Sequence, residues 1–453
     1  MAPQSALLDQ SRLIAIAEQL AEAARRAGAD AADAVAVRSV ALSVEVRDGA
    51  VEESERSESD DFGLRVLVGR RQAVVSSNDV PAQAVRALAE RAVAMARAAP
   101  EDPFAGLAEE EALARSIPDL DLLDPTLPSV EQLEELARTA EAAALATPGV
   151  SKSAGASASA GIGGLVLVTT HGFRGAYLGS HRSLSMTAIA GQGTAMERDY
   201  DFSSAPHAAD LEPPERIGRT AGERAVKRLN PQKVATHRVP VVFDRRVAGS
   251  LLGHLASAIN GAAIARQTSF LKGKLDQQLF GSGIRIIDDP LRRRGLRSRP
   301  FDAEGVAGAS RALIDEGVLQ SWLLDCATAR ELGLKTTGHA SRGVSSVPSP
   351  AATNLYLEAG SRSRDELIAD IESGFYVTDL IGMGANIVTG DYSRGASGVW
   401  IERGALTYPV SEVTIAGHLS DIFRSLEPAN DLEFRYGINA PTVRAEGLTV
   451  AGR

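Results

Sequence analysis

The first apolar positions of the chain recur every three or four residues, which is the spacing of an amphipathic helix. The apolar face consists of Leu13, Ile16, Ala17, Leu20 and Ala24. Asp9 or Ser11 can cap the start of this helix, and Gly28 lies just past its end. The pattern therefore predicts that the chain begins with a helix packed through one face.

Alternating apolar and polar residues follow in ALSVEVRDGAVE, residues 41–52, and predict a strand that ends at an Asp48-Gly49 turn. The polar stretch EESERSESDD, residues 52–61, is expected to separate this strand from the next two. Those are predicted in FGLRVLVGRRQAVVSS, residues 62–77, around a Gly69-Arg70 turn. A second helix is expected from about Asp79, with Pro81 in its first turn.

The Pro- and Asp-rich connector SIPDLDLLDPTLP, residues 116–128, predicts a first domain boundary. Ser129 then begins a helix with a capping-box pattern to Gln132. Residues 151–201 are typical of strands, because Ser and Thr alternate with apolar positions. A helix from Pro213 is expected to end at Asn230-Pro231, the second boundary.

The last part of the chain opens with the strand HRVPVVF, residues 237–243, and a helix that contains LLGHLASAING, residues 251–261. Short strands and Gly-rich turns follow, with brief helices expected near Ser363–Glu372 and Thr414–Arg424. The fold class is therefore α+β: an N-terminal α/β region with mixed or antiparallel sheets and helices, plus a C-terminal antiparallel β-rich domain with a few helices. The predicted domains are 1–118, 119–233 and 234–453.

Charge and composition exclude several classes of protein. The net charge of −10 opposes phosphate binding, and the short runs Arg245-Arg246 and 292–294 are expected to be solvated surface, so no direct nucleic-acid partner is predicted. The single cysteine, Cys326, excludes an internal disulfide and indicates a reducing compartment, the cytoplasm. No apolar run approaches the ~20 residues of a membrane span, so no membrane association is expected.

The chemistry carried by LLGHLASAING depends on His254. A zinc-protease helix needs two histidines four residues apart with a glutamate beside the first, but Leu255 and Ala258 occupy those positions here. A triad of Ser250, His254 and Asp244 lacks the sharp nucleophile turn such chemistry uses. The Gly-rich residues 382–398 suit a peptide lying along a strand and a tight hairpin equally well.

Three long segments identify a resemblance that covers nearly the whole chain. Residues 265–290, 323–343 and 386–419, the last beginning NIVTGDYSRGASGVWIE, closely resemble the PmbA (TldE) branch of the TldD/PmbA family. The resemblance implies a cytoplasmic heterodimer of TldD and TldE subunits that acts as a zinc metalloprotease on unfolded peptides. It also implies that only the TldD branch carries the H-E-x-x-x-H helix and a further Cys ligand near the C-terminus.

Placed on this chain, that helix falls on LLGHLASAING. The first histidine falls on Gly253, the glutamate on His254, and the second histidine on Ala258 or a neighbour. The C-terminal ligand falls near Tyr436–Ala440, which contains no cysteine. The resemblance therefore implies no catalytic or metal-binding residue here, no cofactor bound by this chain, and zinc in the partner subunit.

The resulting prediction is a non-catalytic subunit that completes a protease with a TldD-type partner and encloses unfolded peptide substrates. Cavity or partner contacts are assigned to His254, Arg266, Ser269, Lys272, Asp391 and Arg394. Ordinary helix-end and turn polarity explains each of these residues equally well. Two alternatives remain open: a homodimeric, gyrase-modulator-type regulator that binds peptides without proteolysis, and a stand-alone hydrolase that uses residues such as Ser250 and His254.

Overall fold

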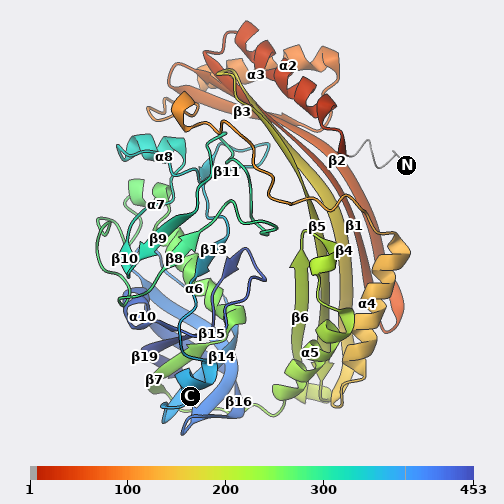
Figure 1. The fold of residues 1–453 in the computed structure, drawn as a ribbon, viewed down its shortest axis with the longest axis vertical. Coiled ribbons are helices and arrows are strands. Elements are labelled where there is room, and N and C mark those ends of the chain that lie inside the picture. Colours follow the sequence, from red (N-terminus) through yellow and green to blue (C-terminus); the bar gives the residue numbers. More distant parts are fainter. Residues whose placement is uncertain (1–7, 383, 453) are drawn as a thin grey trace.

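A single long sheet makes up most of the N-terminal half of the molecule (Figure 1). The computed structural model describes residues 8–382 and 384–452, so residues 1–7 of the N-terminal stretch and Met383 of the Gly-rich segment lie outside the described residues. Within the described part, six antiparallel strands are arranged in the order β3-β2-β1-β4-β5-β6. The strands are β1 (Ala31–Arg47), β2 (Ala50–Val68), β3 (Arg71–Ser77), β4 (Val150–Thr169), β5 (Arg174–Ala190) and β6 (Glu197–Ala205).

The two expected N-terminal domains contribute to this one sheet. Strand β1 pairs with β4 from Asp33↔Thr169 to Val46↔Ala156, so residues on both sides of the 116–128 connector share a continuous hydrogen-bonded ladder. The even-numbered positions of β1 carry the buried Ala34 and Val44 on one face of the sheet. The helices cover that face, whereas Val35 on the other face joins a cluster with Phe173 and Phe301.

Two pairs of helices cover the sheet at its two ends (Figure 1). Helices α2 (Ser11–Arg26) and α3 (Ala82–Ala98) pack at one end. Helices α4 (Val130–Leu145) and α5 (Pro214–Lys227) pack at the other, and the predicted capping box of Ser129 and Gln132 begins α4. Short 3-10 turns lie at Glu110–Ala112 (η1), Gly193–Ala195 (η2) and Ala208–Asp210 (η3).

The expectation for residues 52–61 is wrong. This polar stretch lies inside β2 and pairs with β1 as far as Glu53↔Glu45, although its side chains are exposed on both faces until Asp60. Alternation in a sequence reports burial of one face, and this ribbon has no buried face there. Main-chain hydrogen bonds to β1, and not side-chain packing, fix the position of this stretch.

The C-terminal half contains two main sheets. Within the described residues, one has the order β16-β15-β14-β7-β19-β17 and the other the order β10-β9-β8-β13-β18. Most of the pairs are antiparallel, as expected, but β14–β7 and β13–β18 are parallel. The strands of the first sheet are β7 (His237–Phe243), β14 (Ser373–Ile381), β15 (Asp391–Glu402), β16 (Ala405–His418), β17 (Glu427–Pro428) and β19 (Val443–Ala451).

The second sheet and the remaining helices complete this half. Its strands are β8 (Ile286–Asp288), β9 (Arg311–Asp315), β10 (Val318–Leu319), β13 (Leu355–Leu357) and β18 (Ile438–Asn439), beside a small β11 (Ala340–Ser341) and β12 (Ser349–Pro350) pair. The helices are α6 (Arg245–Ala258), α7 (Gly261–Ala265), α8 (Cys326–Glu331), α9 (Arg364–Ile368) and α10 (Leu419–Ser425). The brief helix expected at 414–424 therefore begins only at Leu419, because residues 414–418 continue β16.

The fold is α+β, as predicted, and α6 lies at the centre of its C-terminal half. The buried face of α6 joins a core that includes strands β7 and β14 of one sheet and β8 and β13 of the other. None of the helices in the described residues is long and apolar enough to span a bilayer.

Candidate functional site

Helix α6 contains most of LLGHLASAING, and its sequence explains its position. Asp244 caps it, since its Oδ1 accepts the Arg246 N–H at 2.9 Å. Leu251, Leu252 and Leu255 recur at helical spacing and are almost completely buried. His254 falls beside this apolar face and is half-buried.

His254 lies in an environment that disfavours positive charge. Its ring packs edge-to-face on Tyr392 of β15, with centroids 5.8 Å apart. Burial and the nearby Arg394 guanidinium lower the pKa of His254 to about 4. Its Nε2 is buried and has no hydrogen-bond partner within the described residues. The imidazole is therefore neutral near pH 7, and Arg394 repels any cation that approaches it.

The residues of α6 do not fit a zinc centre. Gly253 has no side chain and Ala258 carries only a fully buried methyl group, so neither position assigned to a histidine offers a ligand atom. Across the described residues, no group of three or more His, Cys, Asp and Glu side chains is placed to hold a metal ion.

The segment assigned to the C-terminal ligand does lie beside α6. A Cβ on Gly249 would be 2.9 Å from the Ile438 carbonyl oxygen, so the helix and β18 are in close backbone contact. Asn439 is buried, and its Oδ1 accepts the N–H groups of Arg435 and Tyr436. The two segments that the resemblance relates to a metal site are thus neighbours, but Gly253 and Ala258 stand at the histidine positions and residues 436–440 contain no cysteine.

The other nucleophilic candidates are occupied or inert. The Ser250 hydroxyl donates to the Val247 carbonyl at 2.7 Å within α6, which is ordinary helix geometry. Cys326 is buried, and burial together with the neighbouring Glu304 raises the pKa of its thiol. Neither group is poised as an activated nucleophile.

The six candidate contacts fall into two places. His254 and Arg394 are brought together, and Arg394 also donates to the Leu380 carbonyl at 3.4 Å. The other place is formed by two loops in contact with each other, since the Phe270 N–H of one donates to the Ile387 carbonyl of the other at 2.9 Å. Arg266 and Lys272 lie on the first loop and Asp391 begins β15 just after the second, and all three side chains are exposed.

Ser269 has a structural role instead. It is buried, its hydroxyl donates to the Ala258 carbonyl at 2.6 Å, and it accepts the Leu271 N–H at 3.1 Å. It therefore ties the end of α6 to the following loop. The Gly-rich segment serves chain packing in a similar way, since a Cβ on Gly398 would lie 1.9 Å from the Tyr376 carbonyl oxygen of β14. The hairpin interpretation explains that glycine.

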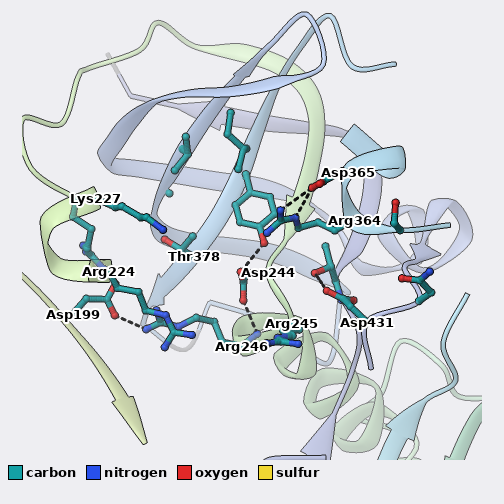
Figure 2. Close-up of a pocket in the computed structure, with 18 residues that line it drawn as sticks. Asp199, Arg224, Lys227, Asp244, Arg245, Arg246, Arg364, Asp365, Thr378 and Asp431 are labelled. Carbon is teal, nitrogen blue, oxygen red and sulfur yellow. Dashed lines mark hydrogen bonds and ion pairs between the residues drawn. The ribbon is translucent and has the colours of Figure 1, made fainter. Parts of the chain in front are cut away.

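A cavity between the two halves of the molecule was missed by the sequence analysis (Figure 2). It has a volume of about 550 Å³ and lies at the N-terminus of α6, about 15 Å along the helix from His254. A second cavity of about 810 Å³ shares Asp199 and Arg228 with it. The first is lined by β6 and α5 from the N-terminal half and by α6, α9, β14 and β15 from the C-terminal half.

Ion pairs join the two halves across this cavity. Asp199 of β6 pairs with Arg246 of α6 at 2.7 Å, and Arg228 after α5 pairs with Asp379 of β14 at 3.2 Å. Burial works to lower the pKa of Arg246, but the attraction of Asp199 outweighs it and the pKa is raised. The expectation that Arg246 is solvated surface is therefore wrong: its side chain is only 8% exposed. The only signal in the sequence was the adjacent arginine pair itself.

Comparisons with known proteins relate the chain to one family. The chain matches family models described as PmbA/TldA metallopeptidase domain 1 over residues 32–96, central domain over 123–229 and C-terminal domain over 236–452. It is 37% identical to "Metalloprotease PmbA" of Escherichia coli O157:H7, over 94% of this chain and 93% of that protein. The chain belongs to the PmbA/TldD family.

The likeness is greater to PmbA proteins of this family than to a TldD homologue. The "Metalloprotease PmbA homolog" of Haemophilus influenzae is 36% identical over 95% of this chain and 94% of its own. The "Metalloprotease TldD homolog" of the same organism is 26% identical over 52% of this chain and 53% of its own. The chain is thus a PmbA-type (TldE-type) member.

Solved structures share the fold. A Bacteroides thetaiotaomicron protein, described as a proposed modulator of DNA gyrase, superposes with a TM-score of 0.90 at 27% identity, over 98% of this chain and 99% of its own. TldE from Thermococcus kodakarensis superposes with a TM-score of 0.86 at 20% identity, over 96% and 100% of the two chains, which shows the fold alone.

Proposed function

We propose that this chain is the non-catalytic, TldE-type subunit of a heterodimeric zinc metalloprotease that cleaves unfolded peptides. The observation that carries the proposal is the state of α6, where an open Gly253, a neutral His254 beside Arg394 and a buried Ala258 stand at the positions assigned to the metal site. In this proposal the zinc belongs to a TldD-type partner, and this chain binds no metal.

The contribution of this chain would be to bind and enclose the substrate. The cavities at the N-terminus of α6 lie between the two halves of the chain and have the size of ligand sites, ~300–1,000 Å³. The exposed Arg266, Lys272 and Asp391 are proposed as partner contacts, because their loops adjoin each other. The buried free thiol of Cys326 supports a cytoplasmic location.

Co-expression with a TldD-type protein tests the proposal. The chain, the partner and the co-purified complex are each assayed for zinc by mass spectrometry and for cleavage of an unfolded peptide. We expect one zinc per partner subunit, none in this chain, and cleavage by the complex. A partner with glutamine in place of its motif glutamate is the matched inactive control, and this chain with His254→Gln should support full cleavage.

Two outcomes would replace the proposal with another function. Chelator-sensitive cleavage by this chain alone would mean a stand-alone hydrolase. Failure of the two proteins to co-purify, together with a homodimer of this chain that binds peptides without cleaving them, would mean a regulator.

A further inference from the structure

Exposed apolar side chains gather in the second cavity between the halves. Met196 is 41% exposed, Tyr200 is 42% exposed and Ile381 is 62% exposed, and all three line that cavity. Met196 and Tyr200 come from the region of β6 and Ile381 from the end of β14, so the patch is assembled from both halves. Apolar surface of this kind is costly to leave in water and marks a binding site when it lies in a concave region.

The adjoining first cavity has more positive than negative charge. Its described lining contains six basic side chains and four acidic ones. Two of these carboxylates already bind neutral donors: Asp244 accepts the Tyr376 hydroxyl and a helix N–H, and Asp431 accepts the N–H and hydroxyl of Thr442. The five arginines of the described lining already pair with carboxylates, some of which lie outside it, such as Asp379 for Arg228 and Glu433 for Arg245.

Lys227 is the basic group with the most freedom. Its side chain is exposed and makes no ion pair or hydrogen bond with any residue that the structure describes. Figure 2 shows it extending from the end of α5 into the cavity, toward Thr378. By contrast, Arg224 pairs with Asp201 at 2.8 Å, and Arg246 pairs with Asp199.

Side chains close the free edge of β6, which borders both cavities. Arg224 donates to the Tyr200 carbonyl at 3.1 Å, and Arg435 donates to the Phe202 carbonyl. The Tyr200 N–H is bound by the Asp199 carboxylate at 2.7 Å. A peptide cannot pair with these main-chain groups by strand addition without displacing them, so recognition here must come from ligand side chains or a chain terminus.

We propose that these two cavities form one site for an extended peptide segment that carries an apolar side chain close to a carboxylate. The apolar side chain packs on Met196, Tyr200 and Ile381, and the carboxylate pairs with Lys227. The carboxylate belongs either to an acidic residue or to the carboxyl terminus of the peptide. This inference rests on the proposed function, because it takes the ligand to be the peptide substrate of that complex.

Binding of three short peptides to the purified full-length chain tests the site without the partner subunit. The reference is an acetylated, amidated hexapeptide of Ala with one Leu and a nearby Gln. The second carries Glu for Gln, and the third keeps Gln but has a free carboxyl terminus. We expect the second or third to bind about tenfold more tightly than the reference by calorimetry, the factor that corresponds to 1.4 kcal/mol. Added salt should reduce this preference.

Matched variants locate the two parts of the site. Lys227→Gln should abolish the preference for a carboxylate, whereas Lys274→Gln, the same change at an exposed lysine outside both cavities, should leave it intact. Ile381→Ser should weaken all three peptides, and Val347→Ser, at a residue 43% exposed, should weaken none. Equal affinities for the three peptides would contradict the proposed site. So would equal effects of the two lysine variants on the preference for a carboxylate. Zinc content and co-purification, which test the proposed function, do not enter these readouts.

Discussion

His254 should make the stability of this chain fall in mild acid. Its pKa is lowered from 6.5 to about 4, by burial and then by Arg394. Below about pH 6.5 the unfolded chain therefore takes up a proton at this residue and the folded chain does not. The stabilisation is complete above that pH and is lost progressively as the pH falls toward 4.

The size of the effect follows from the lowered pKa and the partial exposure of the ring. A fully buried group with this pKa would contribute on the order of 3 kcal/mol. His254 is only half-buried and solvent screens part of the interaction, which leaves about 2 kcal/mol. The comparison variant is His254→Gln, which keeps a polar side chain but does not titrate.

Urea unfolding between pH 7.5 and pH 4.5 measures the effect. The two tryptophans, Trp322 and Trp400, are buried in the same core as α6, so their fluorescence reports on that half of the molecule. The wild type should lose about 2 kcal/mol relative to His254→Gln over this range. His171→Gln, at an exposed histidine, is the control and should track the wild type.

Two results would refute this reasoning. One is a constant difference between the wild type and His254→Gln at every pH. The other is a His254 ring proton, assigned by its absence in the variant, that titrates near 6.5 in a nuclear magnetic resonance experiment. Either would mean that the ring is solvated and that Arg394 does not act on it.

Three further predictions concern packing and charge. Burial raises the pKa of Glu304 to about 7. The wild type should therefore lose stability relative to Glu304→Gln as the pH rises from about 4.5 to 7. The same difference in urea midpoint between the two proteins at pH 5 and at pH 8 would contradict this. Gly249→Ala should lower the free energy of unfolding by about 1–3 kcal/mol, because its Cβ pushes α6 away from the Ile438 carbonyl. Gly253→Ala, which has open space, should be neutral or stabilising. Equal melting temperatures of the two variants would contradict this prediction. Ser269→Ala should lower the free energy of unfolding by about 1–3 kcal/mol, because it leaves the Ala258 carbonyl at the end of α6 without its hydroxyl donor. A urea midpoint equal to that of the wild type would contradict this prediction.

Local signals in the sequence located most elements because those elements are determined locally. The capping box of Ser129 and Gln132, the Asp48-Gly49 turn and the helical spacing of Leu251 and Leu255 each act within a few residues of the chain. Such features depend on neighbours in the sequence, so their residue types alone predict them.

The first cavity, between the two halves of the molecule, could not be predicted in this way. It depends on Asp199 reaching Arg246 across two halves of the chain, and on Lys227 extending from a helix that ends before the second predicted boundary. Nothing in the spacing of these residues relates them, because the fold alone brings them together. The same holds for the polar half of β2, whose pairing with β1 leaves no mark on the alternation of its side chains.

The charges around α6 connect the two parts of the proposed function. A metal site needs anionic or neutral donors and no competing cation. Here Arg394 lies beside the ring of His254, which occupies the position assigned to the motif glutamate. At the other end of the helix, arginines and Lys227 surround a cavity that suits a carboxylate. Arg394 therefore opposes zinc beside His254, and Lys227 favours an acidic group of a peptide in the cavity. In the proposed function, this chain contributes by holding the peptide, and the metal belongs to its partner.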